Sequence, residues 1–507
     1  MAFDYISVDR DQQFLLPPDM REWLPAGHLV WFVLEVVERV DTSGLHARHP
    51  RDGVGRRAYD PDMLLALLVY AYCTGQRSSR QIERLCEVDV GYRVICANSV
   101  PDHTTIARFR QGHQDEAVRL FTDVLMMCAA CGLAKVGVVA VDGTKIAAVA
   151  SLKANRTRVQ VEAEVAKMIA EADEVDRGED DLFGGGRGDG LPDDLVDPRT
   201  RKARLDAAVA ELERARLERK AVELTELQAK IETRRGSSRQ LTCPIAGTEV
   251  DAAVVALELA RAGAVEHRAA VVERAVREGR PLVGRPPGER GAMVKRAEQR
   301  LQRALARQAA RDRQEAARDL TVRVNTSDPD SRIMKSTQGW VQGFNAQAAA
   351  NEDGIVVAGD VTREGNDSLQ CQPMIAATLA SLRAAGIVEP VGIMLFDAGY
   401  ISDDNLRAPG PDRLIATGKS HTLRKSAPTC GPVPAGLSAT AAMEHRLRTP
   451  EGAEAYKKRQ HIIEPVFGTI KESRGYRRFS RRGVEAVKAE WLLILAAHNI
   501  NKAFKHS

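Results

Sequence analysis

The 507-residue sequence lacks the features that would place it in a membrane or outside the cell. No apolar run approaches the ~18–20 residues that a membrane-spanning helix needs. The N-terminal stretch MAFDYISVDRDQQF has no basic segment followed by an apolar core, so we expect no secretory signal. The 8 cysteines are scattered over a long chain, unlike a disulfide framework. A cytoplasmic protein without a membrane partner is therefore the expectation.

Several common catalytic motifs are missing as well. The glycine-rich stretch GGGRGDG lacks the preceding strand and the following Lys-Ser/Thr of a phosphate-binding loop, so we expect no nucleotide cofactor. The Ser, Cys and His residues form no nucleophile-elbow or triad motif. Cys128 and Cys131 form a lone CxxC in an apolar helical stretch, which favours structural cysteines over a zinc site. For His103 and His113, beside an arginine-rich stretch, DNA contact and helix capping both stay open.

Charge is present but unevenly placed. The chain carries a formal net charge of +4, whereas residues 456–507 alone hold 12 Lys/Arg and 4 Asp/Glu. This C-terminal block therefore carries an excess of positive charge, and the remainder of the chain is slightly negative. A basic block indicates a polyanionic partner such as DNA. A solvated basic surface is an equally good interpretation from charge alone.

The first 135 residues predict short helices. In DPDMLLALLVYAYCTG, Asp60 is placed to cap a helix and Pro61 to occupy its first position. Asp102 is a similar cap for the segment that follows it. Short helices with exposed arginines suit a DNA reader of the helix-turn-helix type, and a plain helical bundle is the alternative. The arginines are Arg77, Arg80, Arg84, Arg108 and Arg110.

The rest of the chain predicts an interrupted α/β core. Apolar, β-branched runs indicate strands at 136–141 and before Asp397, and a hairpin turns at 351–354. The final apolar stretch, VEAVKAEWLLILAAHNINKAFK, predicts an amphipathic helix. Residues 155–322 are rich in Ala, Glu, Arg and Leu and predict a helical insertion. The predicted fold is thus α/β, with a core in two parts, 136–154 and 323–507, behind an all-helical domain over 1–135.

Two predicted strands each deliver an aspartate at the end of an apolar run. VGVVAVDGTK contains Asp142, and EPVGIMLFDAGY contains Asp397. A buried lone carboxylate costs several kcal/mol unless it is paired or metal-bound. Adjacent strands would bring the two carboxylates together, and oxygen ligands favour Mg²⁺ or Mn²⁺. A pair of such ions suits phosphoryl transfer. Capping a turn is the plainer role for either aspartate by itself.

A third acid would complete such a site. Glu464 is the best candidate, because it lies early in a helical run with Lys471 seven residues on, on the same face. Asp360 and Asp367 compete with Asp397 for the second position. Asp360 is expected inside a hairpin strand, followed by Val361 and Thr362, whereas Asp397 opens a glycine turn that frees its side chain.

The motifs, taken in order, resemble those of the DDE insertion-sequence transposases. The similar segments are PDHTTIARFRQGH, VDGTKI around Asp142, TSDPDSRIMKSTQGWVQGFNAQ, FDAGYISDDNL around Asp397, YKKRQHIIEPVFGTIKESRGYRRFSRRG and the closing AEWLLILAAHNINKAF. They span nearly the whole chain, and the insertion is least specific. The resemblance implies a helical N-terminal domain before a ribonuclease-H-like catalytic core with a mixed sheet.

The resemblance also implies an enzyme and its site. Asp142, Asp397 and Glu464 would bind two Mg²⁺ or Mn²⁺ ions and serve as the catalytic triad. The enzyme would bind terminal inverted repeats, cut the element ends and join their 3′-hydroxyls to target DNA, as a homodimer on paired ends. Tyr456, Arg459 and Lys471 fit a signature around the glutamate, although four residues rather than three separate Arg459 from Glu464.

Further cations are expected to hold DNA phosphates, which makes binding salt-dependent. The residues expected to contact DNA are Tyr456, Arg459, Lys471, Arg477, Arg478, Arg481, Arg482, Arg108 and Arg110. Two other functions stay open at this point. One is a metal-dependent nuclease on the same fold without strand transfer, and the other is a DNA-binding repressor of a related element.

Overall fold

The computed structural model describes residues 19–47, 58–157, 159–167, 210–211, 213–214, 249–281, 291–336, 339–418 and 427–506. The chain divides into two compact units. The first joins Met1–Ala154 to Ser327–Ser507, and the second is Asn155–Thr326. None of the described helices is long and apolar enough to cross a bilayer.

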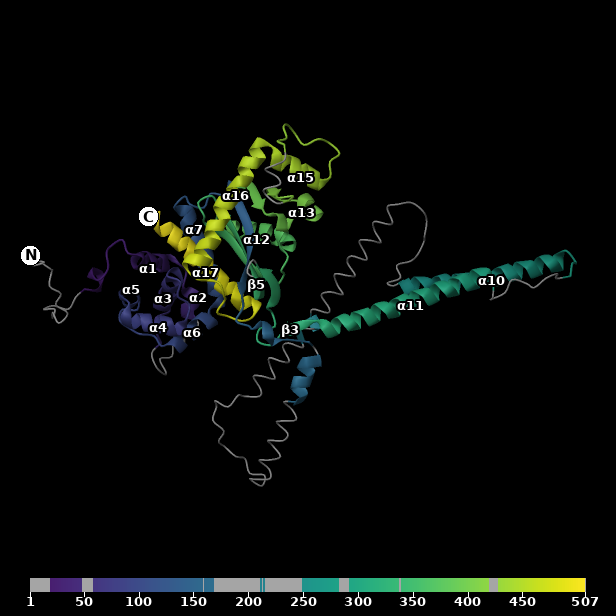
Figure 1. The fold of residues 1–507 in the computed structure, drawn as a ribbon, viewed down its shortest axis with the longest axis horizontal. Helices are drawn as coiled ribbons and strands as arrows, with labels where there is room; N and C mark the ends of the chain where they lie inside the picture. Colours follow the sequence, from purple (N-terminus) through teal and green to yellow (C-terminus); the bar gives the residue numbers. More distant parts are fainter. Residues whose placement is uncertain are drawn as a thin grey trace, which may run out of the picture. The chain divides into compact units, whose positions relative to one another are not determined.

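The first unit begins with a group of helices, which confirms the predicted helical N-terminal region (Figure 1). α3 shows why this region folds: Asp60 caps it by accepting from the Asp62 amide, Pro61 starts it, and nearly every residue is buried. Asp102 likewise caps α6. The helices are η1 (Met20–Glu22), α1 (Leu29–Arg39), α2 (Ser43–Ala47), α3 (Pro61–Cys73), α4 (Ser79–Val88), α5 (Val90–Ile95), α6 (His103–Gly112) and α7 (Gln114–Ala130).

A mixed sheet of six strands forms the centre of the same unit (Figure 1). Its order is β4-β5-β1-β7-β8, and β6 pairs with β5 beside β4. β5 runs antiparallel to β1, β4 and β6, whereas β1, β7 and β8 run parallel. The strands are β1 (Val138–Ala147), β4 (Arg332–Ser336), β5 (Gly339–Asn351), β6 (Val356–Thr362), β7 (Ile393–Phe396) and β8 (Asp412–Ile415).

Two strand predictions have different outcomes. The hairpin that turns at 351–354 is confirmed by the pairing of β5 with β6. The first predicted strand is longer than its apolar run at 136–141, because β1 continues through Asp142 to Ala147. Its second half is held by pairing with β5, from Asp142 opposite Ala348 to Ala147 opposite Gly343. Asp142 therefore lies inside a strand.

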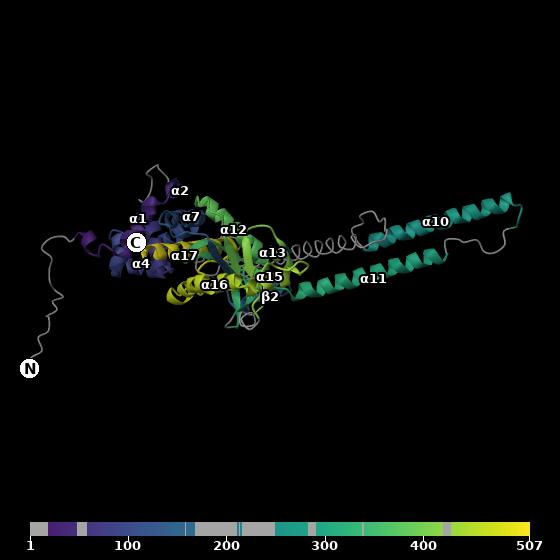
Figure 2. The same cartoon turned by 90° about the horizontal axis from the view of Figure 1, so that it is seen from above.

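Helices cover both faces of the sheet (Figures 1 and 2). α12 contacts β5 and β6, α16 contacts β1, β5 and β7, and α17 contacts β6 together with α3 and α7. The remaining elements are η3 (Asp367–Gln370), α12 (Cys371–Ala384), η4 (Ala398–Tyr400), α13 (Asp403–Arg407), α15 (Ala439–Arg448), α16 (Pro450–Gly468), the π-helical turn η5 (Thr469–Ser473) and α17 (Val484–Phe504).

The C-terminal helix α17 is more deeply buried than predicted. An amphipathic helix was expected, yet every residue from Ala489 to Ile500 is buried. The reason is that α17 packs against the sheet through β6 and against the N-terminal helices through α3 and α7. Two of its buried polar side chains bond to strand backbone: Trp491 Nε1 donates to the Gln347 carbonyl, and Asn499 exchanges hydrogen bonds with the backbone of Val356.

The second unit is helical in its described parts apart from one short ladder. β2 (Asn155–Thr157) pairs antiparallel with β3 (Arg323–Asn325). The long helices α10 (Glu249–Arg277) and α11 (Ala292–Thr321) lie side by side, as Figure 2 shows. The other parts of the predicted insertion lie outside the described residues, except for a helical stretch at 159–167 and four residues near 212.

Candidate active site

Asp142 lies on β1, the central strand between β5 and β7. Its Oδ1 accepts from the Gly143 amide at 2.8 Å, and its Oδ2 accepts from Arg459 Nη2 at 2.7 Å. The carboxylate is 20% exposed. Burial raises its pKa to about 6, and the charge of Asp397 adds to that rise while the Arg459 guanidinium opposes it. Asp142 is therefore a carboxylate that ionises at some cost and gains from a nearby cation.

Asp397 directly follows β7 and caps the short helix η4, as the predicted glycine turn requires. Its Oδ1 accepts from the Gly399 amide at 2.8 Å. Its Oδ2 lies 3.9 Å from the same Arg459 Nη2 that binds Asp142. β1 and β7 pair in parallel up to Ala140 opposite Leu395, so continuing this register by two residues brings Asp142 level with Asp397, the first residue after β7.

Arg459 and Tyr456 reach this site from α16, where they lie one helical turn apart. Tyr456 Oη donates to the carbonyl of Phe396, the residue before Asp397. Burial lowers the pKa of Arg459, but the charges of Asp142 and Asp397 outweigh it, so the net shift is upward. Both side chains thus contact the aspartate-bearing strands, despite the departure in their spacing from Glu464.

Lys471 approaches the same face of β1 from the π-helical turn. Its Nζ donates to Thr144 Oγ1 at 2.7 Å, and Thr144 lies two residues beyond Asp142 on that face. Burial lowers the pKa of Lys471, and the neighbouring Arg477 charge acts in the same direction. Such π-turns are frequent at functional sites.

Glu464 is not brought into contact with the two aspartates. It lies five residues beyond Arg459 on α16, roughly 140° around the helix, where it is exposed and accepts from Gln460 Nε2 at 3.2 Å. Within the described residues, oxygens of Asp142, Asp397 and Glu464 do not all lie within 4.8 Å of one another. The assignment of Glu464 as a metal ligand stays a prediction.

Asp367 was missed as part of this region, having been considered only as a competitor of Asp397. It begins η3, and its Oδ1 accepts from Lys145 Nζ at 3.1 Å, Asn345 Nδ2 at 2.7 Å and Gln347 Nε2 at 2.9 Å. Its position in sequence, just after β6, was the available signal. Asp360, the other competitor, accepts from its neighbour's amide and pairs with Lys488 at 2.7 Å.

The arginines expected to contact DNA fall into two groups. Arg108, Arg477, Arg478 and Arg482 are exposed, although Arg477 pairs with Glu472 and Arg482 Nε donates to the Val149 carbonyl. Arg110 and Arg481 are half-buried and bonded internally. The predicted DNA contacts of both groups stay predictions.

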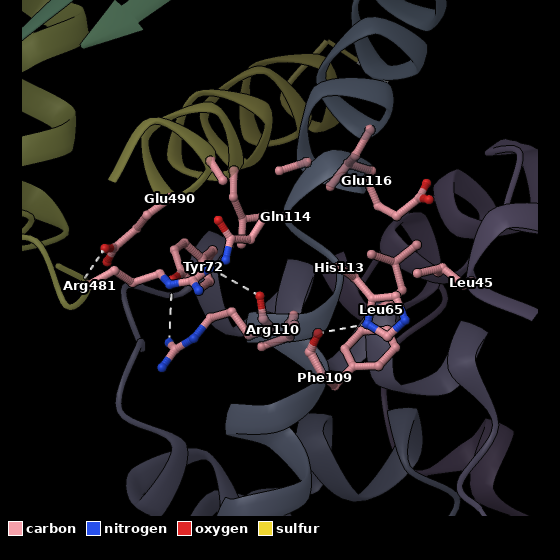
Figure 3. Close-up of a pocket in the computed structure, with 15 residues that line it drawn as sticks. Leu45, Leu65, Tyr72, Phe109, Arg110, His113, Gln114, Glu116, Arg481 and Glu490 are labelled. Carbon is pink, nitrogen blue, oxygen red and sulfur yellow. Dashed lines mark hydrogen bonds between the residues drawn. The ribbon is translucent and has the colours of Figure 1, made fainter. Parts of the chain in front are cut away.

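Figure 3 shows the contact between Arg481 and Arg110, the two members of the second group. Arg481 Nη1 donates to the Arg110 carbonyl, and Arg110 Nη1 donates to the Arg77 carbonyl at 2.6 Å. Both arginines line a small pocket with Glu490, whose buried carboxylate accepts from the amides of residues 480 and 481. These two arginines tie the N-terminal helices to the segment before α17.

The two histidines and the CxxC cysteines have structural surroundings. His103 Nδ1 lies 2.8 Å from Glu83, and His113 Nδ1 lies 2.7 Å from the Phe109 carbonyl. Cys128 is buried on α7 and Cys131 is exposed at its end. Among the described residues, His46, Asp60 and Asp62 form the one group of three potential metal ligands whose ligand atoms lie within 4.8 Å of one another. His46 and Asp60 are exposed and Asp62 is half-buried.

The paired aspartates suit a divalent cation. Both offer carboxylate oxygens, which Mg²⁺ and Mn²⁺ prefer. Arg459 shows that a cation is accommodated between them, because one guanidinium nitrogen faces both side chains. The raised pKa of Asp142 reports an excess of buried negative charge that a cation would relieve. A mixed α/β sheet with level acids on adjacent parallel strands thus defines a candidate site for metal-assisted chemistry.

Two parts of the chain match protein-family models. Residues 18–112 match a model described as Transposase domain (DUF772), and residues 433–504 match one described as Transposase DDE domain. Together these matches support the assignment of the chain to the DDE insertion-sequence transposases. The second match includes Tyr456, Arg459, Glu464 and Lys471. Searches of curated proteins and of solved structures gave no match.

Proposed function

We propose that this protein is a DNA transposase that binds the terminal inverted repeats of an insertion sequence, cuts at the element ends and joins the 3′-hydroxyls to target DNA. The observation that carries the proposal is the pair Asp142 on β1 and Asp397 at the end of the adjacent β7, both facing one guanidinium, in a chain with two matches to transposase family models. DNA is the substrate that this family acts on.

The proposal includes the architecture implied by the resemblance. The mixed sheet is the ribonuclease-H-like core, assembled from 136–154 and 323–507. Residues 1–135 are the DNA-binding helical domain, and 155–322 are the insertion. A homodimer pairs the two element ends. The parallel β1, β7 and β8 beside antiparallel β5 support the core assignment, because such a sheet brings residues 142 and 397 to one place.

The site is proposed to hold one or two divalent ions through Asp142, Asp397 and Glu464. Bound Mg²⁺ or Mn²⁺ supplies Lewis acidity and a nucleophile at neutral pH for phosphodiester chemistry. The chain itself does the positioning: Arg459 aligns the two aspartates, and Tyr456 fixes the Phe396 carbonyl before Asp397. Lys471, held by Thr144, presents a positive charge to a DNA phosphate on the same face.

A cleavage and joining assay tests the proposal. Purified protein is incubated with Mg²⁺ and a duplex carrying the inverted repeat, and nicked, cut and joined products are separated on gels. We expect Asp142→Asn and Asp397→Asn to lose at least about 100-fold in cleavage rate, with Glu464→Gln close behind. Asp360→Asn is the matched control, because Asp360 pairs with Lys488 outside the site and should keep wild-type activity.

Each other outcome has a distinct meaning. Variants that cut and join as well as wild type would overturn the catalytic assignment. Cutting without joining would favour the metal-dependent nuclease, and binding without cutting would favour the repressor. Loss of activity in Asp142→Asn and Asp397→Asn but not in Glu464→Gln would remove Glu464 from the site.

A further inference from the structure

A polar cluster lies behind Asp142, on the other face of β1. Side chains alternate along a strand, so Gly143 and Lys145 face away from Asp142 and Thr144. On that side Lys145, Asn345 and Gln347 all donate to Asp367 Oδ1, and Lys145 Nζ also lies 3.3 Å from Oδ2. Asn345 and Gln347 are fully buried, and Lys145 and Asp367 are 14% and 22% exposed.

The side chains of this cluster lie close to the backbone of Gly143, the residue after Asp142. A Cβ atom at Gly143 would lie 2.7 Å from Asp367 Oδ1 and 2.9 Å from Asn345 Oδ1, and closer still to Gln347 Nε2. No side chain fits there, so glycine lets the three polar groups support the peptide that follows Asp142. That peptide donates its amide to Asp142 Oδ1. The support therefore acts one residue from the carboxylate.

The same cluster reaches the turn that carries Asp397. Tyr400 Oη donates to Gln347 Oε1, and Tyr400 is fully buried three residues after Asp397. Asp367 also borders this turn, because a Cβ at Gly399 would lie 3.6 Å from Asp367 Cβ. Gly399 is the residue whose amide Asp397 caps. The Gln347 side chain thus lies against Gly143, beside Asp142, and connects Asp367 with the Asp397 turn: its Nε2 donates to Asp367, and its Oε1 accepts from Tyr400.

We infer that Gln347, held by Asp367 and Tyr400, is a positioning residue that fixes the separation of Asp142 and Asp397. The inference rests on the proposed function of those two aspartates. Asp367 is assigned to this supporting cluster rather than to the cation, because its Oδ1 already accepts three hydrogen bonds and Lys145 balances its charge. Supporting residues of this kind change metal affinity or activity by about 10–100-fold when they are removed.

The test uses the full chain and variants that delete single hydrogen bonds. Tyr400→Phe removes the hydroxyl that holds Gln347, and Gln347→Leu removes the bridge. Mn²⁺ affinity is measured from the electron paramagnetic resonance signal of free Mn²⁺, and end cleavage is measured in single turnover. We expect both variants to weaken Mn²⁺ binding and to slow cleavage about 10-fold or more, with unchanged affinity for the repeat DNA. The double variant should cost little more than Gln347→Leu, because the two act through one bridge.

Tyr476→Phe is the matched control. Tyr476 is buried like Tyr400, and its hydroxyl donates to the Tyr72 carbonyl at 2.9 Å, away from the aspartates. It should lose comparable stability and keep Mn²⁺ affinity and cleavage. Folded Tyr400→Phe and Gln347→Leu with wild-type Mn²⁺ affinity and cleavage would overturn the inference while the proposed function stands. Mn²⁺ binding and cleavage that are the same in Asp142→Asn as in wild type would overturn both the inference and the proposed function.

Discussion

The acids on the two sides of β1 differ in how their negative charge is compensated. On one face, Asp142 and Asp397 share a single guanidinium nitrogen, and their further hydrogen bonds within the described residues come from the amides of Gly143 and Gly399. On the other face, Asp367 accepts from three side-chain donors, one of them a lysine. Burial without full compensation raises the pKa of Asp142 to about 6. The difference supports the proposal that a cation binds on the first face and that the second face positions the acids.

The largest expected effect on stability comes from substituting Asp367, whose carboxylate accepts from three side chains. Asp367→Leu leaves the half-buried Lys145 ammonium without its partner and strips an acceptor from two buried amides. We expect the free energy of unfolding to fall by about 2–4 kcal/mol, measured by urea denaturation. Asp142→Asn should cost distinctly less in the same assay. Equal losses of unfolding free energy in the two variants would show that the charge of Asp367 is no better compensated than that of Asp142.

The shared guanidinium gives the next prediction. Arg459→Gln removes the cation that faces both aspartates but keeps a donor of similar reach. We expect the two carboxylates to repel more strongly and single-turnover cleavage to slow about 10–100-fold. Lys458→Gln is the control, because the neighbouring Lys458 pairs with the exposed Glu352. Similar rates for both variants would show that Arg459 does not act on the aspartates.

The raised pKa of Asp142 predicts that the stability of the protein depends on pH. Its folded pKa is raised from 3.8 to about 6, so between these values the folded state holds the proton more firmly than the unfolded chain does. The contribution of Asp142 to stability therefore falls as pH rises from about 4 to 6. Relative to wild type, Asp142→Asn should gain about 2–3 kcal/mol across this range, measured by denaturation at each pH. A constant difference would show that the carboxylate is not destabilised by burial.

The smallest effect is expected at Lys471. The side chain is held by Thr144 next to Asp142 and provides one positive charge to DNA. Lys471→Gln should reduce the slope of log affinity against log salt concentration by about one, measured by fluorescence anisotropy with repeat DNA. Lys502→Gln serves as a control, because Lys502 lies at the end of α17 near Gly354. Equal slopes for Lys471→Gln and wild type would remove Lys471 from the DNA contacts.

Parts of this arrangement were predictable from local chemistry. Asp60 with Pro61 fixed the start of α3, and the glycine turn identified Asp397 as a side chain free to cap. Whether the first strand continues past Asp142 could not be decided from the sequence, because Gly143 and Lys145 interrupt the apolar pattern and long-range pairing with β5 maintains the strand. The role of Asp367 was hidden for the same reason: its three donors lie 20 to 222 residues away in sequence.

For helix α16, the sequence predicted the site residues but not which of their side chains reach the strands. Its sequence places Tyr456, Arg459 and Glu464 on one helix, but the direction in which each side chain points depends on how the helix packs against β1. The structure turns Tyr456 and Arg459 toward the strands and leaves Glu464 exposed. The buried residues Ile462, Ile463 and Val466 lie on the same face of α16 as Arg459, so this apolar stripe was the available signal for the side that faces the sheet.

The central claim is that Asp142 and Asp397 together bind a divalent cation. The most direct test is the change in melting temperature on adding Mn²⁺ at pH 7 to wild type, Asp142→Asn, Asp397→Asn and Asp62→Asn. Selective binding to the folded state raises the melting temperature, so we predict a rise in wild type and Asp62→Asn that is lost in the other two. A rise that persists in Asp142→Asn and Asp397→Asn, and disappears in Asp62→Asn, would place the cation at the exposed His46 group and contradict the account.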